Sequence, residues 1–112
     1  MKEMTDGFEE RKRAYEEKFA HDQELRFKAE ARRNRLLGLW VAELLGLSGP
    51  EAEKYAEEVV MADLEEPGDE DVFRKIRADL DAKGVDISDH RIRRRMEELL
   101  IEAMEQISRE AD

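Results

Sequence analysis

A charged run that turns into an apolar helical stripe, over residues 19–47, constrains the fold of this chain more than any other feature. The apolar residues of the stripe recur at steps of three and four: Leu25, Ala29, Leu36, Leu37, Trp40, Val41, Leu44 and Leu45. Such steps place side chains on one face of an α-helix. We therefore predict one long helix over residues 22–45, closed by Gly46.

Glycine, proline and polar cap residues divide the next part of the chain into two shorter predicted helices. The first starts at Ser48, where Ser48 and Glu51 have the spacing of a capping box and a proline follows at the helix entry. It is expected to run to about residue 66, where Pro67 stops it. Asp69 is expected to cap the second of these helices.

Gly84 is expected to end that helix, and Ser88 can cap a last helix with the cleanest apolar stripe in the chain. The stripe consists of Ile92, Met96, Leu99, Leu100, Ala103 and Ile107. No run alternates apolar and polar residues for long enough to predict a strand. Four helices joined by short loops predict an all-α fold, a four-helix bundle over residues 20–112.

Residues 1–19 precede this bundle and form a separate, highly charged segment. Met4, Phe8, Tyr15 and Phe19 share one helical face, which makes the segment amphipathic. The apolar face is thin, and an isolated helix of fewer than about 15 residues is marginal in water. We therefore predict a flexible arm, disordered or a frayed helix when free and helical when bound. The alternative is a fifth helical piece docked on the bundle.

Composition and charge exclude several classes of protein. The chain has 112 residues, a net charge of -10 and no cysteine, so disulfides and thiolate chemistry are excluded and nucleic acid is not an expected partner. The longest apolar run, residues 36–47, is broken by Glu43 and is shorter than the roughly 20 residues of a membrane span. We therefore expect no direct insertion into a membrane.

Basic residues gather in two short stretches, residues 26–35 and 91–95, with an acidic stretch between them. This segregation suggests ion pairs between the chain's own helices, or an orientation on a partner. Alternatively, the side chains of Arg32, Arg33 and Arg94 could hold the phosphates of a nucleotide. That alternative describes a small nucleotide-binding sensor, or a helical adaptor, with weak ATP or ADP binding.

No group of residues has the composition of a catalytic or metal site. Asp79, Asp81 and Gly84 match three positions of a calcium-binding loop, but Lys83 and His90 stand where two further ligands are needed. A cation and an imidazole at these positions do not suit calcium. The sequence also lacks a glycine-rich phosphate loop and a paired nucleophile, so we predict no cofactor, no metal and no enzymatic activity.

Five stretches in fixed order give the chain a specific resemblance to a known family. They are KFAHD at residues 18–22, ELRFKAEARRNRLLGLW at 24–40, AELLGLSG at 42–49, EEPGDEDVFRK at 65–75 and RADLDAKGVDISDH at 77–90. On these stretches the chain resembles the alphaproteobacterial ATPase inhibitor subunit zeta, a small partner of the F-type ATP synthase. The resemblance extends over residues 8–106.

The resemblance implies a non-enzymatic inhibitor with a four-helix bundle and an N-terminal inhibitory segment. In the family this segment enters an α/β interface of the catalytic head as a helix, reaches towards the γ subunit and blocks rotation in the hydrolytic direction. The implied partners are the α, β and γ subunits, and the implied location is cytoplasmic, peripheral on the inner membrane. We expect a monomer when the protein is free. Here extra residues precede Phe8, near which the family usually begins.

Two kinds of residue in the arm fit this mechanism. The aromatic residues Phe8, Tyr15 and Phe19 are expected to be apolar anchors in the subunit crevice. Four basic residues are expected to pair with acidic groups lining it: Arg11, Lys12, Arg13 and Lys18. Burying the aromatics gains several kcal/mol, roughly what ordering about 18 residues costs. The bundle or its first helix is therefore expected to add contacts.

Overall fold

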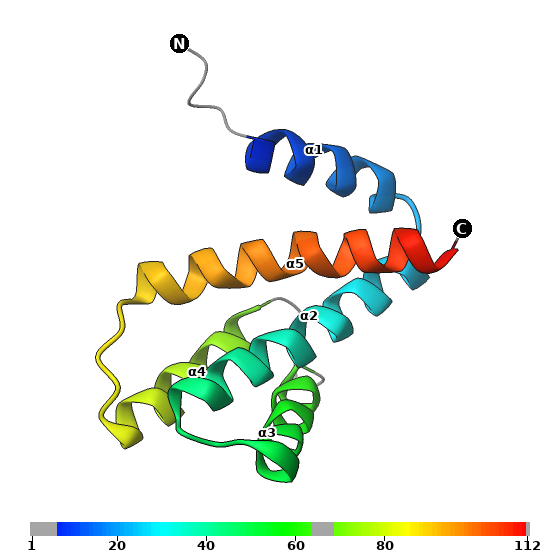
Figure 1. Cartoon of the computed structure of the whole chain (residues 1–112). Helices are drawn as coiled ribbons and strands as arrows, with labels where there is room; N and C mark the ends of the chain where they lie inside the picture. Colours follow the sequence, from blue (N-terminus) through cyan, green and yellow to red (C-terminus); the bar gives the residue numbers. More distant parts are fainter. Residues whose placement is uncertain (1–6, 64–68, 112) are drawn as a thin grey trace.

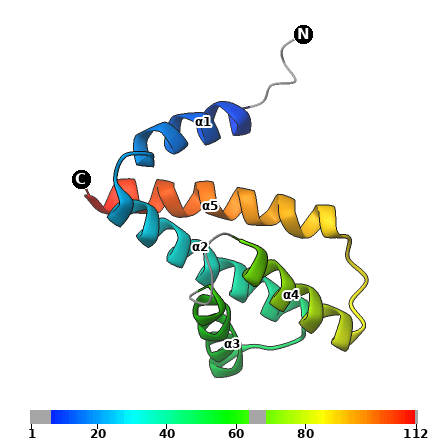
Figure 2. The same ribbon diagram turned by 180° about the vertical axis from the view of Figure 1, so that it is seen from behind.

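A computed structural model of the protein describes residues 7–63 and 69–111. These residues form five α-helices: α1 (Gly7–Phe19), α2 (Gln23–Leu44), α3 (Gly49–Ala62), α4 (Glu70–Lys83) and α5 (Asp89–Ala111). The long helix α5 runs through the middle of the molecule, with α1 on one side and α2, α3 and α4 on the other (Figures 1 and 2). None of the helices in the described part of the chain combines the length and the apolar character needed to cross a bilayer.

The predicted all-α fold is confirmed, with the four helices expected after residue 20 and one more in the arm. The extra helix, α1, packs against α5 and the start of α2. The docked fifth helix that the sequence left open is therefore the arrangement in this structure. The boundary between arm and bundle at residue 19, and the behaviour of the arm in the free protein, stay predictions.

Three of the predicted helix ends are confirmed by their local geometry. The carboxylate of Asp22 accepts a hydrogen bond from the Leu25 backbone N–H at 3.0 Å, which caps α2. Ser88 Oγ accepts from the Arg91 N–H at 3.1 Å ahead of α5. Gly84 ends α4 with a φ of 79°, a left-handed conformation that favours glycine.

Two other predictions of a helix cap are wrong, because the side chain concerned makes no capping hydrogen bond. Ser48 precedes α3 with extended backbone, but its side chain makes no capping bond. Asp69 precedes α4 without a capping bond, because its carboxylate accepts instead from the guanidinium of Arg33 on α2. The helix expected to reach about residue 66 ends at Ala62. The predicted stop at Pro67 lies outside the described residues.

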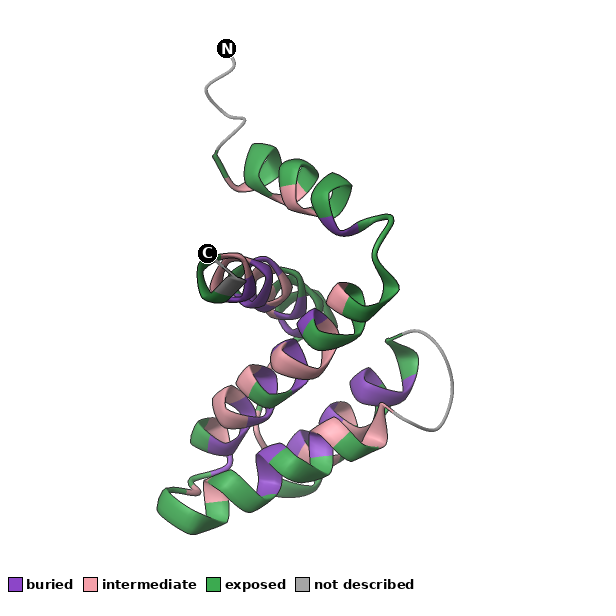
Figure 3. Cartoon of the chain, turned by 90° about the vertical axis from the view of Figure 1, so that its right-hand side faces the viewer, coloured by how far each residue is buried: buried purple, intermediate pink, exposed green. Residues whose placement is uncertain are grey.

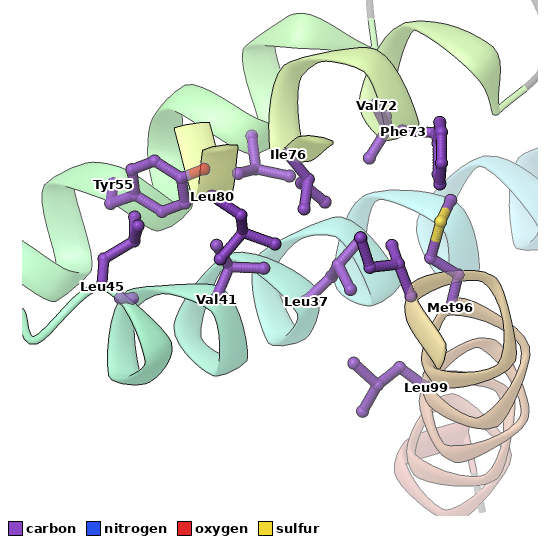
Figure 4. Packing of buried hydrophobic residues seen from close by; sticks show 13 residues of the cluster. Leu37, Val41, Leu45, Tyr55, Val72, Phe73, Ile76, Leu80, Met96 and Leu99 are labelled. Atoms are coloured by element: carbon purple, nitrogen blue, oxygen red, sulfur yellow. The ribbon is translucent and has the colours of Figure 1, made fainter. Parts of the chain in front are cut away.

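The main core fills the space between α2, α3, α4 and the first half of α5. Its buried side chains include Leu37, Val41, Tyr55, Ile76, Leu80, Met96 and Leu99 (Figure 4). Helices α2 and α3 come especially close at Gly38, where a Cβ atom would lie 2.6 Å from the Cα of Ala56. A glycine is therefore required at this crossing, because any side chain would push the two helices apart.

A second, smaller apolar cluster joins α1 to the rest of the molecule. It contains Phe19 of α1, Ala29 of α2, and Ile101, Met104 and Ile107 of α5. Phe19 is 1% exposed, and its burial contributes about 2 kcal/mol. The outer face of α1 is exposed, and its inner face turns towards α5 (Figure 3). The cluster thus places the predicted inhibitory arm on the second half of α5.

Candidate functional site on the N-terminal helix

Helix α1 has its charged residues placed to match the helix dipole, and its aromatic residues spaced to lie on one face. Glu9 and Glu10 lie in the first turn and Lys18 in the last, as the helix dipole favours. The aromatic residues Phe8, Tyr15 and Phe19 are seven and four residues apart, so they share a face. Phe8 and Tyr15 are half-buried against the second cluster, and Phe19 is fully buried. All three predicted anchors are thus brought together, on α5.

Three of the four predicted basic residues of α1 pair with polar groups of α5. The distances between the paired atoms are 2.9 Å for Arg11 Nε and Glu105 Oε2, 3.3 Å for Lys12 Nζ and Glu97 Oε2, and 3.1 Å for Lys18 Nζ and Ser108 Oγ. The fourth residue, Arg13, is exposed. These contacts lie at the molecular surface, where an ion pair contributes only about 0–1 kcal/mol.

Arg94 of α5 contacts the first turn of α1, at the end of the helix opposite Phe19. Its guanidinium carbon lies 4.5 Å from the centre of the Phe8 ring, which is a cation–π contact. The Nε atom of Arg94 also lies 3.3 Å from Oε2 of Glu98, one turn further along α5. The sequence pointed to Arg94 as a candidate for nucleotide binding and did not reveal this role. Contacts between residues so far apart in the chain leave no local sequence signal.

The three arginines considered for nucleotide binding do not converge on one site. Arg32 donates through both terminal nitrogens to Glu110, at 2.6 and 3.0 Å. These hydrogen bonds lower the pKa of the Glu110 carboxyl. Arg33 is buried and Arg94 lies over Phe8. Each guanidinium is engaged within the chain, so the structure gives the nucleotide-binding alternative no common phosphate site.

Arg33 forms a buried polar group at the middle of α2. Its side chain is 2% exposed and donates to Asp69 Oδ1 at 2.8 Å and to Asn34 Oδ1 at 2.7 Å. Burial raises the pKa of the nearby Glu30 carboxyl, and Arg33 opposes that shift. Burial also raises the pKa of Asp63 at the end of α3. The group therefore ties α2 to the start of α4 and is a structural feature.

The carboxylates of the calcium-like stretch are engaged in ion pairs and hydrogen bonds. Asp79 accepts from the hydroxyl of Tyr55 at 2.6 Å and from Lys75 at 3.0 Å. Asp81 accepts from Arg77. Burial and the bond to Asp79 raise the pKa of the Tyr55 hydroxyl. Within the described ranges no three acidic, histidine or cysteine side chains form a group that could hold a metal ion.

One exposed aromatic residue was missed by the sequence analysis. Phe27 of α2 is 61% exposed and lies off the apolar stripe that begins at Leu25 and Ala29. That offset was the available signal, because an aromatic residue outside the buried face of a helix must point to solvent.

Comparisons with known proteins agree with these observations. The family model of ATPase inhibitor subunit zeta matches residues 4–106, which includes most of the arm and nearly all of the bundle. A protein whose structure was determined by NMR in solution has 53% sequence identity to this chain. The match covers 77% of this chain and 98% of that protein, and the TM-score between the two structures is 0.69. No curated protein matches the chain. The chain therefore belongs to the ATPase inhibitor subunit zeta family, regulatory proteins of the F-type ATP synthase and not enzymes.

Proposed function

We propose that the protein inhibits ATP hydrolysis by inserting α1 as a helix into an α/β interface of the synthase head. There the helix reaches towards the γ subunit and blocks rotation in the hydrolytic direction. The observation that carries the proposal is the arrangement of α1, a short amphipathic helix with all its aromatic residues on one face. In this proposal the protein acts in the cytoplasm, held peripherally at the inner membrane through the synthase.

The proposal requires α1 to leave α5 before it binds the head. Phe8, Tyr15 and Phe19 face α5 in this structure, so they cannot fill a subunit crevice at the same time. The ion pairs that hold α1 lie at the surface: 50% of the Arg11 side chain and 23% of the Glu105 side chain are accessible, and 27% of Lys12 and 48% of Glu97. Such pairs exchange readily for others of similar strength. The aromatic face and basic residues that contact α5 are then available to the partner.

Alanine substitution of the anchors tests this mechanism incompletely. Replacing Tyr15 and Phe19 by alanine is expected to weaken inhibition while the main core stays folded, since that core does not include α1. The same change also removes contacts between α1 and α5. It therefore favours release of the arm while removing its anchors, and the two effects oppose each other.

A reversible tether separates these effects. The chain has no cysteine, so Lys12→Cys with Glu97→Cys gives two unique thiols at a place where α1 and α5 meet. A bifunctional thiol reagent that forms disulfides at both ends then holds α1 on α5. The matched control is Glu70→Cys with Arg93→Cys, an exposed pair that links α4 to α5 and lies away from α1.

The measurement is ATP hydrolysis by the cognate synthase head with added full-length protein. The 12–97 tether is expected to abolish inhibition, a reductant to restore it, and the 70–93 tether to leave inhibition unchanged. A version lacking residues 1–19 is expected not to inhibit. Equal inhibition by the tethered and reduced 12–97 variant would show that α1 acts without leaving α5, or does not act at all.

A further inference from the structure

An open groove lies beside the start of α2, and the proposed insertion of α1 assigns no role to it. It has a volume of about 640 Å³. Its apolar lining comes from α2, α3 and α5 and consists of Leu25, Phe27, Ala31, Val60 and Ile107. Phe27 is 61% exposed, and among the described residues only Met61 is a comparably exposed large apolar side chain. Aromatic side chains at the edge of such a groove are common anchors in protein interfaces.

The charges around the groove identify the kind of partner that it fits. Lys28, Arg32 and Arg35 line it, against one carboxylate, that of Glu110. This basic edge stands out on a chain with a net charge of -10. Arg32 and Arg35 pair with carboxylates of the chain, at Glu110 and Glu53. Both pairs lie at the surface, where a carboxylate of a partner can exchange with them. A complementary partner segment is therefore acidic and carries an apolar side chain.

The groove is continuous with the cluster that holds α1. Leu25 and Ile107 belong to both. Phe27 follows the last residue of α1 by eight positions and lies in the second turn of α2, about 6 Å along its axis. When α1 enters a crevice, the first turns of α2 are therefore held close to the mouth of that crevice.

We propose that this groove, centred on Phe27, is a second docking surface that binds an acidic, apolar segment on the outer face of the synthase head, beside the entry point of α1. The inference rests on the proposed function, because it is the insertion of α1 that would bring the groove to the surface of the head. It also supplies an added contact, since the aromatic residues of α1 only exchange their burial on α5 for burial in the crevice.

Phe27→Ser in the full chain tests the groove, with Met61→Ser as a matched control. Both residues are 61% exposed in helices, but Met61 lines a different surface, with Lys54, Glu57 and Lys75. Phe27→Ser is expected to raise the protein concentration for half-maximal inhibition of ATP hydrolysis about tenfold. Met61→Ser is expected to change it less than twofold. Equal values for the two variants would overturn the docking surface.

Photocrosslinking provides a second measurement that does not depend on potency. With p-benzoylphenylalanine in place of Phe27, irradiation of the full chain on the synthase head is expected to give a product with the α or β subunit. The same group in place of Met61 is expected to give none. A product only with a second copy of this chain, or none from position 27, would also overturn the inference.

The two proposals fail in distinguishable ways. If the 12–97 tether leaves inhibition intact, the insertion of α1 fails, whatever the result at Phe27. If the tether abolishes inhibition but Phe27→Ser inhibits like the unmodified chain and position 27 gives no product, only the docking surface fails.

Discussion

The guanidinium of Arg94 lies 4.5 Å from the centre of the Phe8 ring, so the first turn of α1 is held by the first half of α5. At the other end of α1, Phe19 is buried against the second half of α5. The predicted inhibitory helix is thus fastened at both ends, once by a surface contact and once by apolar burial. The surface contact is the weaker of the two and the one that can be removed without disturbing the core.

Removing the Arg94 side chain is expected to loosen α1 without unfolding the protein. A cation–π contact at an exposed site is worth about 0.5–1 kcal/mol, so Arg94→Ala should speed amide exchange in the first turns of α1 by roughly two- to fivefold. Native-state hydrogen exchange measures this effect. Arg91→Ala, an exposed arginine one turn earlier on α5, is the control and should leave α1 unchanged. Unaltered exchange in both variants would contradict a role for Arg94 in holding the arm.

Gly38→Ala is expected to destabilise the fold, although alanine favours helices. The new Cβ would lie 2.6 Å from the backbone Cα of Ala56, so α2 and α3 must separate. Overpacking costs about 1–3 kcal/mol, and a clash with a backbone atom belongs to the upper part of that range, above the roughly 1 kcal/mol gained in helix propensity. Gly7→Ala meets nothing within 4 Å and should not destabilise the protein. Urea unfolding measures both, and equal midpoints for the two variants would refute the close approach.

Asp69→Ala is expected to destabilise the protein by about 2 kcal/mol, because it leaves the buried Arg33 without its carboxylate partner. The loss is limited because Asn34 Oδ1 still accepts from Arg33. The control is Glu53→Ala, which breaks the exposed pair with Arg35 and should cost no more than about 0.5 kcal/mol. Thermal unfolding of the two variants compares them. Equal losses of stability in the two variants would show that the buried ion pair of Arg33 with Asp69 is worth no more than an exposed pair.

Glu30→Gln is expected to flatten the pH dependence of stability. Burial raises the folded pKa of Glu30 above its ordinary value of 4.5, with smaller additions from Asp63 and Asp69. The folded protein then holds this proton more tightly than the unfolded chain, so the associated stability is present below pH 4.5 and is lost as pH rises through the folded pKa. Glu30→Gln removes that loss and should stabilise the protein at pH 7.

Urea midpoints measured from pH 4 to pH 8 test this prediction. Glu43→Gln, an exposed substitution in the same helix, is the control and should follow the unmodified chain. A pH curve for Glu30→Gln that runs parallel to that of the unmodified chain would contradict the role assigned to this half-buried carboxyl.

Local signals in the sequence predicted the helices well, because the interactions that begin and end a helix join residues three or four apart. The Asp22 cap, the Ser88 cap and the left-handed Gly84 are all of this kind. The apolar stripe of α2 follows from spacing alone, and its residues pack in the main core and, at Leu25 and Ala29, in the second cluster. The family was also recognisable from matched stretches of sequence.

The prediction that Asp69 caps α4 was wrong because the partner of Asp69 is distant in the sequence. Its carboxylate has a choice between the nearby backbone of α4 and an arginine 36 residues away, and it binds the arginine. The bond to Arg33 joins two charged groups, and it supplies a partner to a buried guanidinium that would be costly to leave unpaired. Sequence cannot show this competition, because Arg33 reaches Asp69 only after α2 and α4 have packed.

What the sequence determined by itself is therefore the set of helices, their apolar faces and the amphipathic character of the arm. Only the tertiary structure decided that the arm docks on α5, that Arg32, Arg33 and Arg94 separate, and that Phe27 remains exposed beside a groove. The physical reason is distance along the chain. Arg11 and Glu105 are 94 residues apart, and they meet only because the shared core fixes where each helix lies.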